Sequence, residues 1–179
     1  CANEHAPAAP VDEDSDGSEV AAAAGARSPA RGAAACPTLT APGYTTQPPL
    51  SRLAAMTPAE LACVEDFTVE RRGVGSVCFP GPTDLRGLDL DRVLQIHPKY
   101  VDVYPEGTSK PPVGEGLNRH AVVRLLNVMP PNYPHQSKDD VAKMRKKLKR
   151  AVKRMGARLL SYENGVWEFK VDNFGHAQE

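Results

Sequence analysis

The feature that most limits the fold is the dipeptide Asn164-Gly165, which lies between two β-rich runs near the end of the 179-residue sequence. Asn-Gly is the strongest short signal for a tight β-hairpin, because both residues tolerate the positive φ angles of a type I′ turn. The runs at residues 158–162 and 166–171 therefore predict the two strands of a hairpin. Apolar side chains alternate along the second strand and predict one buried face: Trp167, Phe169 and Val171.

The residues before this hairpin predict a long amphipathic helix from about residue 138 to residue 155. Ser137 and Asp140 have the spacing of a capping box at its start, and Gly156 can end it. Apolar residues recur at intervals of three and four, which places them on one face of the helix: Val141, Met144, Leu148, Val152 and Met155.

Further upstream, Thr57, Pro58 and Glu60 predict a second helix start, since threonine can cap, proline suits the first turn and glutamate completes a capping box. Alternating or continuous apolar runs predict further strands at residues 67–71, 75–79, 101–104 and 121–128. Several strands joined by short turns, with helices among them, predict an α+β fold with a mostly antiparallel sheet.

The first part of the chain differs from the rest in composition. Residues 1–38 contain runs of Ala, Gly and Pro with an acidic cluster, and no aromatic residue. Such a segment buries too little apolar surface to offset the chain entropy lost on folding. We therefore expect a disordered linker at 1–38, a folded domain at 39–175 and a short tail at 176–179.

No motif for metal, cofactor or small-molecule chemistry is visible. The four cysteines form no C-x-x-C pair, the histidines are scattered, and no G-x-S-x-G or H-E-x-x-H run occurs. We therefore expect no metal site, no cofactor and no small-molecule substrate. No run reaches the roughly 20 apolar residues of a membrane-spanning helix, so we expect no membrane span.

The predicted long helix carries many positive charges, although the whole chain is balanced at 22 basic and 22 acidic residues. A basic helical face can bind an acidic partner or RNA, or it can simply be solvated. No aromatic residue interleaves the basic ones, which disfavours base stacking. Three residues are candidates for partner binding on this face: Lys146, Lys149 and Lys153.

Five stretches occur in an order and spacing that chance does not explain: residues 39–44, 67–81, 110–118, 156–158 and 167–174. The most specific is Lys110-Pro111-Pro112-Val113-Gly114-Glu115-Gly116-Leu117-Asn118. Together they resemble the autoproteolytic C-terminal domain of the ninety-eight-kilodalton FG-repeat nucleoporin family. The resemblance covers residues 39–175, about three quarters of the chain.

The resemblance implies a six-stranded sheet with a small second sheet and flanking helices. It also implies an architectural role in the nucleus, where the family's domain anchors an FG-repeat protein at the nuclear pore complex and serves messenger-RNA export and protein transport. The expected partners are other nucleoporins of the pore scaffold and of its cytoplasmic face, with only a weak contact to RNA.

The family cuts its own backbone at a His-Phe-Ser motif, where the serine hydroxyl attacks the preceding carbonyl and the histidine assists as a base. The matching positions here are Asn173, Phe174 and Gly175. Glycine has no hydroxyl and an asparagine side chain is not a base near neutral pH. We therefore expect a degenerate site with no catalytic residue. A self-cleaving serine-type autoprotease and a nucleic-acid-binding module remain as alternatives.

Overall fold

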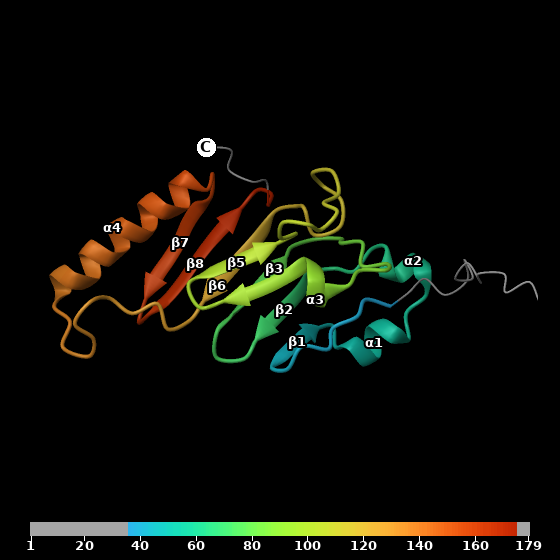
Figure 1. Cartoon of the computed structure of the whole chain (residues 1–179), viewed down its shortest axis with the longest axis horizontal. Coiled ribbons are helices and arrows are strands. Elements are labelled where there is room, and N and C mark those ends of the chain that lie inside the picture. The colour runs from blue at the N-terminus through green and yellow to red at the C-terminus, as the bar shows by residue number, and fades with distance from the viewer. Residues whose placement is uncertain (1–35, 175–179) are drawn as a thin grey trace, which may run out of the picture. The chain divides into compact units, whose positions relative to one another are not determined.

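The computed structural model of the chain describes residues 36–174, and Figure 1 shows their arrangement. The elements follow in the order β1 (Tyr44–Gln47), α1 (Leu50–Ala54), α2 (Pro58–Leu61), β2 (Phe67–Arg71), β3 (Gly75–Phe79), α3 (Leu90–Val93), β4 (Leu94–His97), β5 (Tyr100–Val103), β6 (Ala121–Leu125), α4 (Lys138–Arg154), β7 (Arg158–Glu163) and β8 (Val166–Val171).

Six of the strands form one antiparallel sheet in the order β1-β2-β3-β6-β8-β7, and β4 pairs with β5 in a separate two-stranded sheet. The expected α+β class, the six-stranded sheet and the small second sheet are thereby confirmed. The long connection between β6 and β8 contains α4 and β7, so β8 lies between β6 and β7 and β7 becomes an edge strand.

The core lies against one face of the large sheet. Cross-strand pairing aligns a continuous apolar row across four strands: Val69, Val77, Val123 and Phe169. All four side chains are buried. Because side chains alternate between the two faces of a strand, this row commits one whole face of the sheet to the interior.

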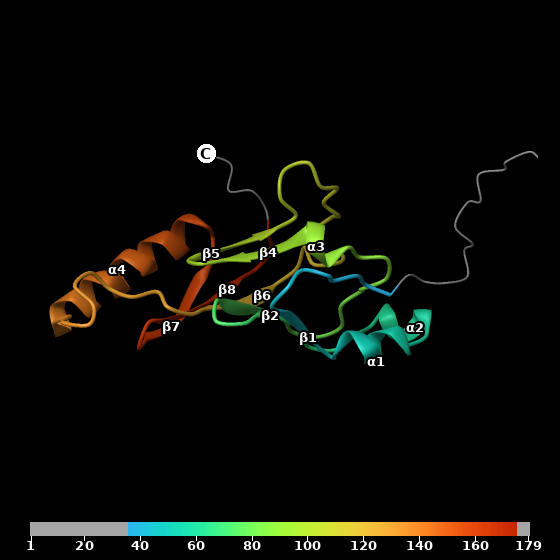
Figure 2. The same ribbon diagram turned by 60° about the horizontal axis from the view of Figure 1, so that its bottom comes forward.

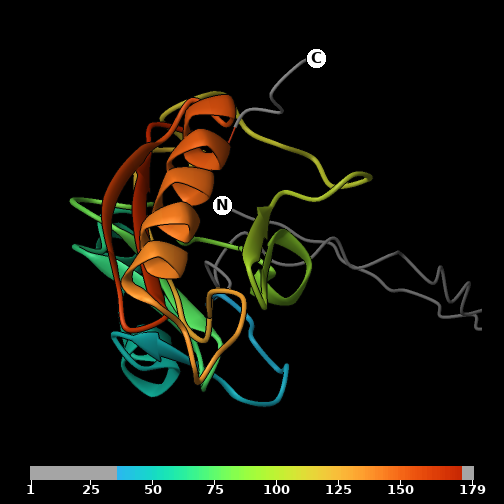
Figure 3. The ribbon, with the colours of Figure 1, turned by 90° about the vertical axis from the view of Figure 1, so that its left-hand side faces the viewer.

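In Figures 2 and 3, α4 and the β4–β5 sheet lie on the same side of the six-stranded sheet. Leu148 and Val152 are the buried residues of α4, and the helix packs mainly against the edge strand β7. The described domain is therefore two-layered, as an antiparallel sheet with one buried face requires.

The predicted hairpin is present as β7 and β8, with Asn164 at φ 49° and Gly165 at φ 74°. Both predicted capping boxes are formed, at Thr57 for α2 and at Ser137 for α4. The buried face of β8 is also confirmed, because its three apolar residues are at most 7% exposed.

Two predicted elements differ in extent. The run at 121–128 forms a strand only to Leu125, because Asn127 adopts a left-handed backbone conformation with φ 57° that ends the pairing. Met155 lies beyond the last residue of α4 as its C-cap and is 48% exposed, so it does not join the buried apolar face of that helix.

Backbone contacts begin at Thr38, which exchanges hydrogen bonds with Leu88 and Leu90 on either side of Asp89. The rest of the predicted linker up to residue 35, together with Gly175 and the predicted tail at 176–179, lies outside the described residues.

Candidate functional site

Phe174 is held at both of its backbone polar groups by the loop between β5 and β6. The side-chain Oδ1 of Asn118 accepts a hydrogen bond from the backbone N–H of Phe174 at 3.2 Å. The ammonium group of Lys110 donates to the backbone carbonyl oxygen of Phe174. These two residues begin and end the run 110–118, so this loop (the clamp loop) fixes the peptide group on each side of Phe174.

The ring of Phe174 is anchored as well. It packs against Phe79 with the ring centroids 6.2 Å apart, and Phe79 in turn stacks on Phe67 at 6.3 Å. Phe67 and Phe79 are fully buried cross-strand neighbours on β2 and β3. The backbone at Phe174 is therefore tied to the core of the sheet rather than only to a surface loop.

Asn118 is itself rigidly placed. Its side chain is 3% exposed, and its Nδ2 donates to the carbonyl oxygen of Pro111 at 2.8 Å. The amide side chain of Asn118 thus donates to Pro111 within the clamp loop through its NH₂ group and accepts from Phe174 through its oxygen. A buried amide with partners on both ends leaves little rotational freedom.

Tyr104 supports the other side of the clamp loop. Its hydroxyl accepts from the backbone N–H of Leu117 at 3.2 Å, and burial raises the pKa of Tyr104 although this hydrogen bond partly opposes the rise. Gly116 has φ +51°, and a Cβ atom there would lie 2.7 Å from the Tyr104 hydroxyl. Glycine is therefore required at this position by both backbone conformation and close approach.

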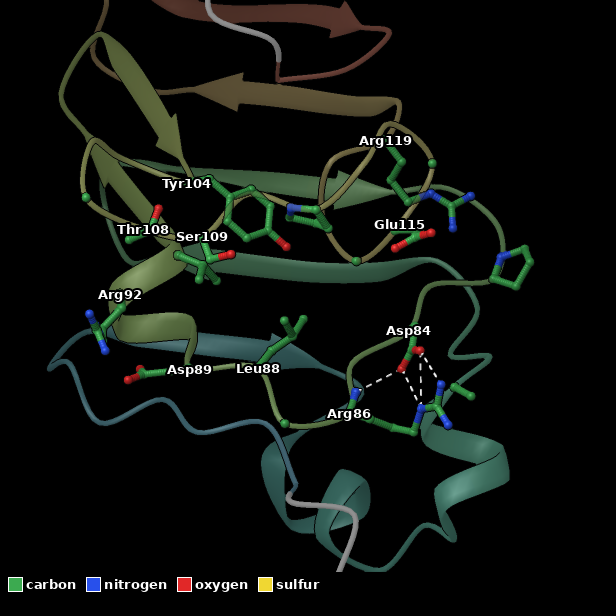
Figure 4. Close-up of a pocket in the computed structure, with 18 residues that line it drawn as sticks. Asp84, Arg86, Leu88, Asp89, Arg92, Tyr104, Thr108, Ser109, Glu115 and Arg119 are labelled. Carbon is green, nitrogen blue, oxygen red and sulfur yellow. Dashed lines mark hydrogen bonds and ion pairs between the residues drawn. The ribbon is translucent and has the colours of Figure 1, made fainter. Parts of the chain in front are cut away.

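A large open cavity of about 1060 Å³ lies beside the clamp loop and is drawn in Figure 4. Tyr104 projects into the middle of the view, Arg119 and Glu115 lie above one side, and Asp84 and Arg86 lie below them. Phe174, Lys110 and Asn118 are not among its lining residues. The cavity and the held Phe174 thus use different faces of the same loop.

Three of the charged residues that line this cavity have partners within the protein, although the Nε of Arg119 is buried with no hydrogen-bond partner among residues 36–174. Arg86 forms an ion pair with Asp84 at 2.6 Å, and hydrogen bonding from Arg86 holds the pKa of Asp84 below its ordinary value. Arg119 donates to the carbonyl oxygen of Pro80 at 3.1 Å and to the Thr83 hydroxyl at 3.4 Å. We find no pair of a nucleophile and a base among the residues that line the cavity.

Two of the three predicted motif residues, Asn173 and Phe174, follow shortly after the end of β8. Asn173 is exposed and Phe174 is half-buried, while Gly175 lies outside the described residues. The structure therefore brings Phe174 together with Lys110 and Asn118. Lys110 and Asn118 belong to the most specific run of the sequence, but the sequence did not predict that they contact Phe174.

The candidate partner-binding residues Lys146, Lys149 and Lys153 all lie exposed on α4. They belong to a basic face that also includes Lys143, Arg145, Lys147, Arg150 and Arg154. Across residues 36–174, no ion pair joins any of these side chains to an acidic group. None of the three lysines contacts the clamp loop in the described part of the chain.

Within the same described range, no cluster of three or more His, Cys, Asp or Glu residues is arranged to hold a metal ion. None of the helices described is long and apolar enough to cross a membrane.

Comparison with known proteins gives a consistent match. The family model Nucleoporin2, described as Nup98-96 autopeptidase S59, matches residues 41–176. The nuclear pore complex protein Nup98-Nup96 of Dictyostelium discoideum is 40% identical over 144 residues, which cover 77% of this chain and 7% of the relative. Nuclear pore complex protein NUP96 of Arabidopsis thaliana is 38% identical over 144 residues, which cover 77% of this chain and 14% of the relative.

Solved structures share the fold. A mutant of the Chaetomium thermophilum Nup145N APD fused to Nup145C N superposes with a TM-score of 0.67 at 32% identity, covering 74% of this chain and 95% of that one. The C-terminal domain of NUP116 from Candida glabrata superposes with a TM-score of 0.63 at 24% identity, covering 76% and 93%. The chain spans only a small part of the length of the curated relatives that it matches.

Proposed function

The chain belongs to the Nup98-96 autopeptidase S59 family, and on that premise we propose that its folded region is a docking domain that anchors an FG-repeat nucleoporin to other nucleoporins. Its relatives are nuclear pore complex proteins, and the nuclear pore complex is accordingly its place of action. Through this anchoring, the domain supports messenger-RNA export and protein transport.

The observation that carries this proposal is the match of residues 41–176 to the family together with a complete, well-packed family fold. The related Chaetomium domain was solved as a fusion with Nup145C N. A nucleoporin segment is accordingly the class of partner that we propose for this chain.

A pull-down tests the docking function. The full chain, immobilised and incubated with nuclear-envelope extract, should retain nucleoporins that mass spectrometry identifies. Recovery of no nucleoporin above the level of an uncoupled support would contradict the proposal.

We further propose that this copy of the domain does not cut itself. In the family reaction, a side-chain oxygen at the position of Gly175 attacks the Phe174 carbonyl carbon, the peptide C–N bond breaks, and water hydrolyses the resulting ester. Gly175 supplies no oxygen and Asn173 supplies no base. Lys110 remains placed to stabilise negative charge on the carbonyl oxygen, but charge stabilisation without a nucleophile performs no reaction.

The basic face of α4 is our proposal for a second contact, made through Lys146, Lys149 and Lys153 with an acidic segment of a partner. The eight positive charges of this face repel one another, and a nearby polyanion would relieve that repulsion. RNA is the competing ligand for the same face. Binding that weakens steeply with salt and shows no preference among RNA sequences would favour RNA over an acidic protein.

A further inference from the structure

The segment between β6 and α4 carries a short proline-rich sequence that takes no part in the clamp around Phe174. It reads Pro130-Pro131-Asn132-Tyr133-Pro134, in which proline occupies three of the five positions. In Figure 1 this segment forms a loop beside the first turn of α4, at one end of the domain. We call residues 130–134 the proline loop.

Most of the proline loop is open to solvent. Every residue from 131 to 139 is exposed, and the side chain of Tyr133 is 57% exposed. A single exposed tyrosine is common on protein surfaces. An exposed tyrosine that follows a pair of prolines is more informative, because proline-rich segments are ligands for a distinct class of aromatic-lined grooves.

The backbone of the proline loop is not tied to the sheet. The N–H of Val128 donates to the carbonyl oxygen of Gly165 at 2.8 Å just before the loop, and the capping box of α4 begins at Ser137 just after it. No backbone hydrogen bond joins residues 129–136 to the rest of the described chain. The loop can therefore change its conformation without breaking the pairing of any strand.

One end of the loop is nevertheless anchored. Pro130 is buried and lines a cavity of about 260 Å³ together with Met129 and Tyr162. Tyr133 borders the same cavity, although more than half of its side chain is exposed. Pro131 and Tyr133 are thus the two side chains of the proline loop that the domain offers most openly to a partner.

From this arrangement we propose that the proline loop binds a WW-type module of a second protein, with Pro131 and Tyr133 as the two side chains that enter its groove. WW modules bind proline-rich segments in the extended polyproline II conformation, and a proline pair followed after one residue by tyrosine is a sequence that they accept. Pro130, Pro131 and Tyr133 have this order. The contact goes beyond docking to nucleoporins, because it uses a different surface and a different class of partner.

Binding in this form requires one backbone rotation. Asn132 has φ 65°, whereas polyproline II has φ near about −75°. Asparagine is one of the residues that adopt both the left-handed and the extended regions, so this rotation is accessible to it. The neighbouring prolines have fixed φ angles already, which reduces the conformational entropy lost on binding.

A titration of a nitrogen-15-labelled WW domain with the unlabelled full chain tests the contact. The probe is a purified WW domain chosen for its binding of Pro-Pro-x-Tyr peptides, and such a synthetic peptide is the positive control. The cross-peaks of the groove residues should shift saturably with a dissociation constant between about 1 μM and 1 mM, as weak recognition of a short segment requires. Groove cross-peaks that respond to the peptide but not to the full chain would overturn the proposal.

Matched variants locate the contact on the chain. Tyr133→Ala and Pro131→Ala should each weaken binding of the WW domain about tenfold or more, because each removes a side chain that enters the groove. His135→Ala changes an exposed residue of the same segment outside the proline loop and should bind as the parent chain does. Circular dichroism spectra equal to that of the parent show that the variants are folded. Unchanged binding by Tyr133→Ala would contradict the assignment.

Two further measurements separate this contact from its alternatives. A labelled SH3 domain should not respond to the full chain, because such domains pair a basic ligand residue with an acidic pocket and residues 129–137 contain no Lys or Arg. A response of the SH3 domain without one of the WW domain would overturn the proposal. Tyr133→Ala should also retain nucleoporins in the pull-down as well as the parent does, and a loss there would assign the loop to nucleoporin docking instead.

Discussion

The side chain of Asn118 accepts a hydrogen bond from the backbone N–H of Phe174 at 3.2 Å, although 56 positions separate the two residues in the sequence. Lys110 donates to the carbonyl group on the other side of Phe174. The backbone at Phe174 is thus held on both sides, while Asn173 offers no base and Gly175 no nucleophile for the cut. This combination is the basis of the proposal that the chain does not cut itself.

Restoring the chemistry should therefore restore the reaction. We expect the double variant Asn173→His with Gly175→Ser to release the peptide that begins at residue 175, because the clamp loop already holds the Phe174 carbonyl. Mass spectrometry over a time course would detect the product. Gly175→Ser alone should react slowly or not at all, since no histidine activates its hydroxyl.

Adding Asn118→Ala to the double variant is the control for the clamp. The triple variant should cleave more slowly than the double variant, because the backbone N–H of Phe174 loses its hydrogen bond to Asn118. Equal rates with and without Asn118 would show that this hydrogen bond does not position the reacting bond.

Trp167 should be a principal contributor to stability. Trp167→Ala is expected to lower the free energy of unfolding by about 3–5 kcal/mol, because the ring is buried and packs 4.6 Å from the ring of Phe169. Denaturant titration followed by circular dichroism would measure this loss. The matched change Leu160→Ala on β7, at an exposed position, should cost less than about 0.5 kcal/mol. Similar costs for the two variants would contradict the assigned core.

Acid should weaken the attachment of residues 40 and 41 to α3. Partial burial raises the pKa of Asp91, but hydrogen bonds from Thr40 and Ala41 outweigh it and hold the pKa below the ordinary 3.8. A carboxylate whose pKa is depressed by folding stabilises the native state above its ordinary pKa, and that contribution disappears as the pH falls through the folded value. The melting temperatures of the parent and of Asp91→Asn should therefore differ at pH 7 and converge near about pH 2. A difference that stays constant with pH would rule out this linkage.

The basic face of α4 should affect binding more than folding. The triple change Lys146→Glu, Lys149→Glu and Lys153→Glu alters exposed side chains with no ion pair in the described chain, so the unfolding free energy should change by less than about 1 kcal/mol. Affinity for an acidic nucleoporin segment should fall, with a weaker dependence on salt than in the parent. Unchanged affinity would mean that the face is only solvated.

Local signals predicted much of the fold. The Asn164-Gly165 turn, the two capping boxes and the alternation along β8 depend on neighbouring residues, and each appears where the sequence placed it. The short elements β1, α1, α3 and β4 were not predicted, because four or five residues carry too little periodicity to separate a strand or a helix from a loop.

The candidate site was harder to predict for a physical reason. Lys110 and Asn118 reach Phe174 through contacts 64 and 56 positions away, and no local pattern encodes such contacts. The available signal for this contact was that a polar residue stands at each end of the run 110–118, which is unusually specific to the family. The indole N–H of Trp167 is buried and has no hydrogen-bond partner among residues 36–174. This could not be inferred from the sequence, because a pattern of alternation predicts burial but not hydrogen bonding.

The central proposal is that this chain has the family's fold but does not cut itself. Intact-mass spectrometry of the freshly purified chain, repeated after prolonged incubation at neutral pH, tests it most directly. The account predicts one species that extends unbroken through Glu179 at every time point, since Gly175 offers no nucleophile. A fragment that ends at Phe174 would contradict it.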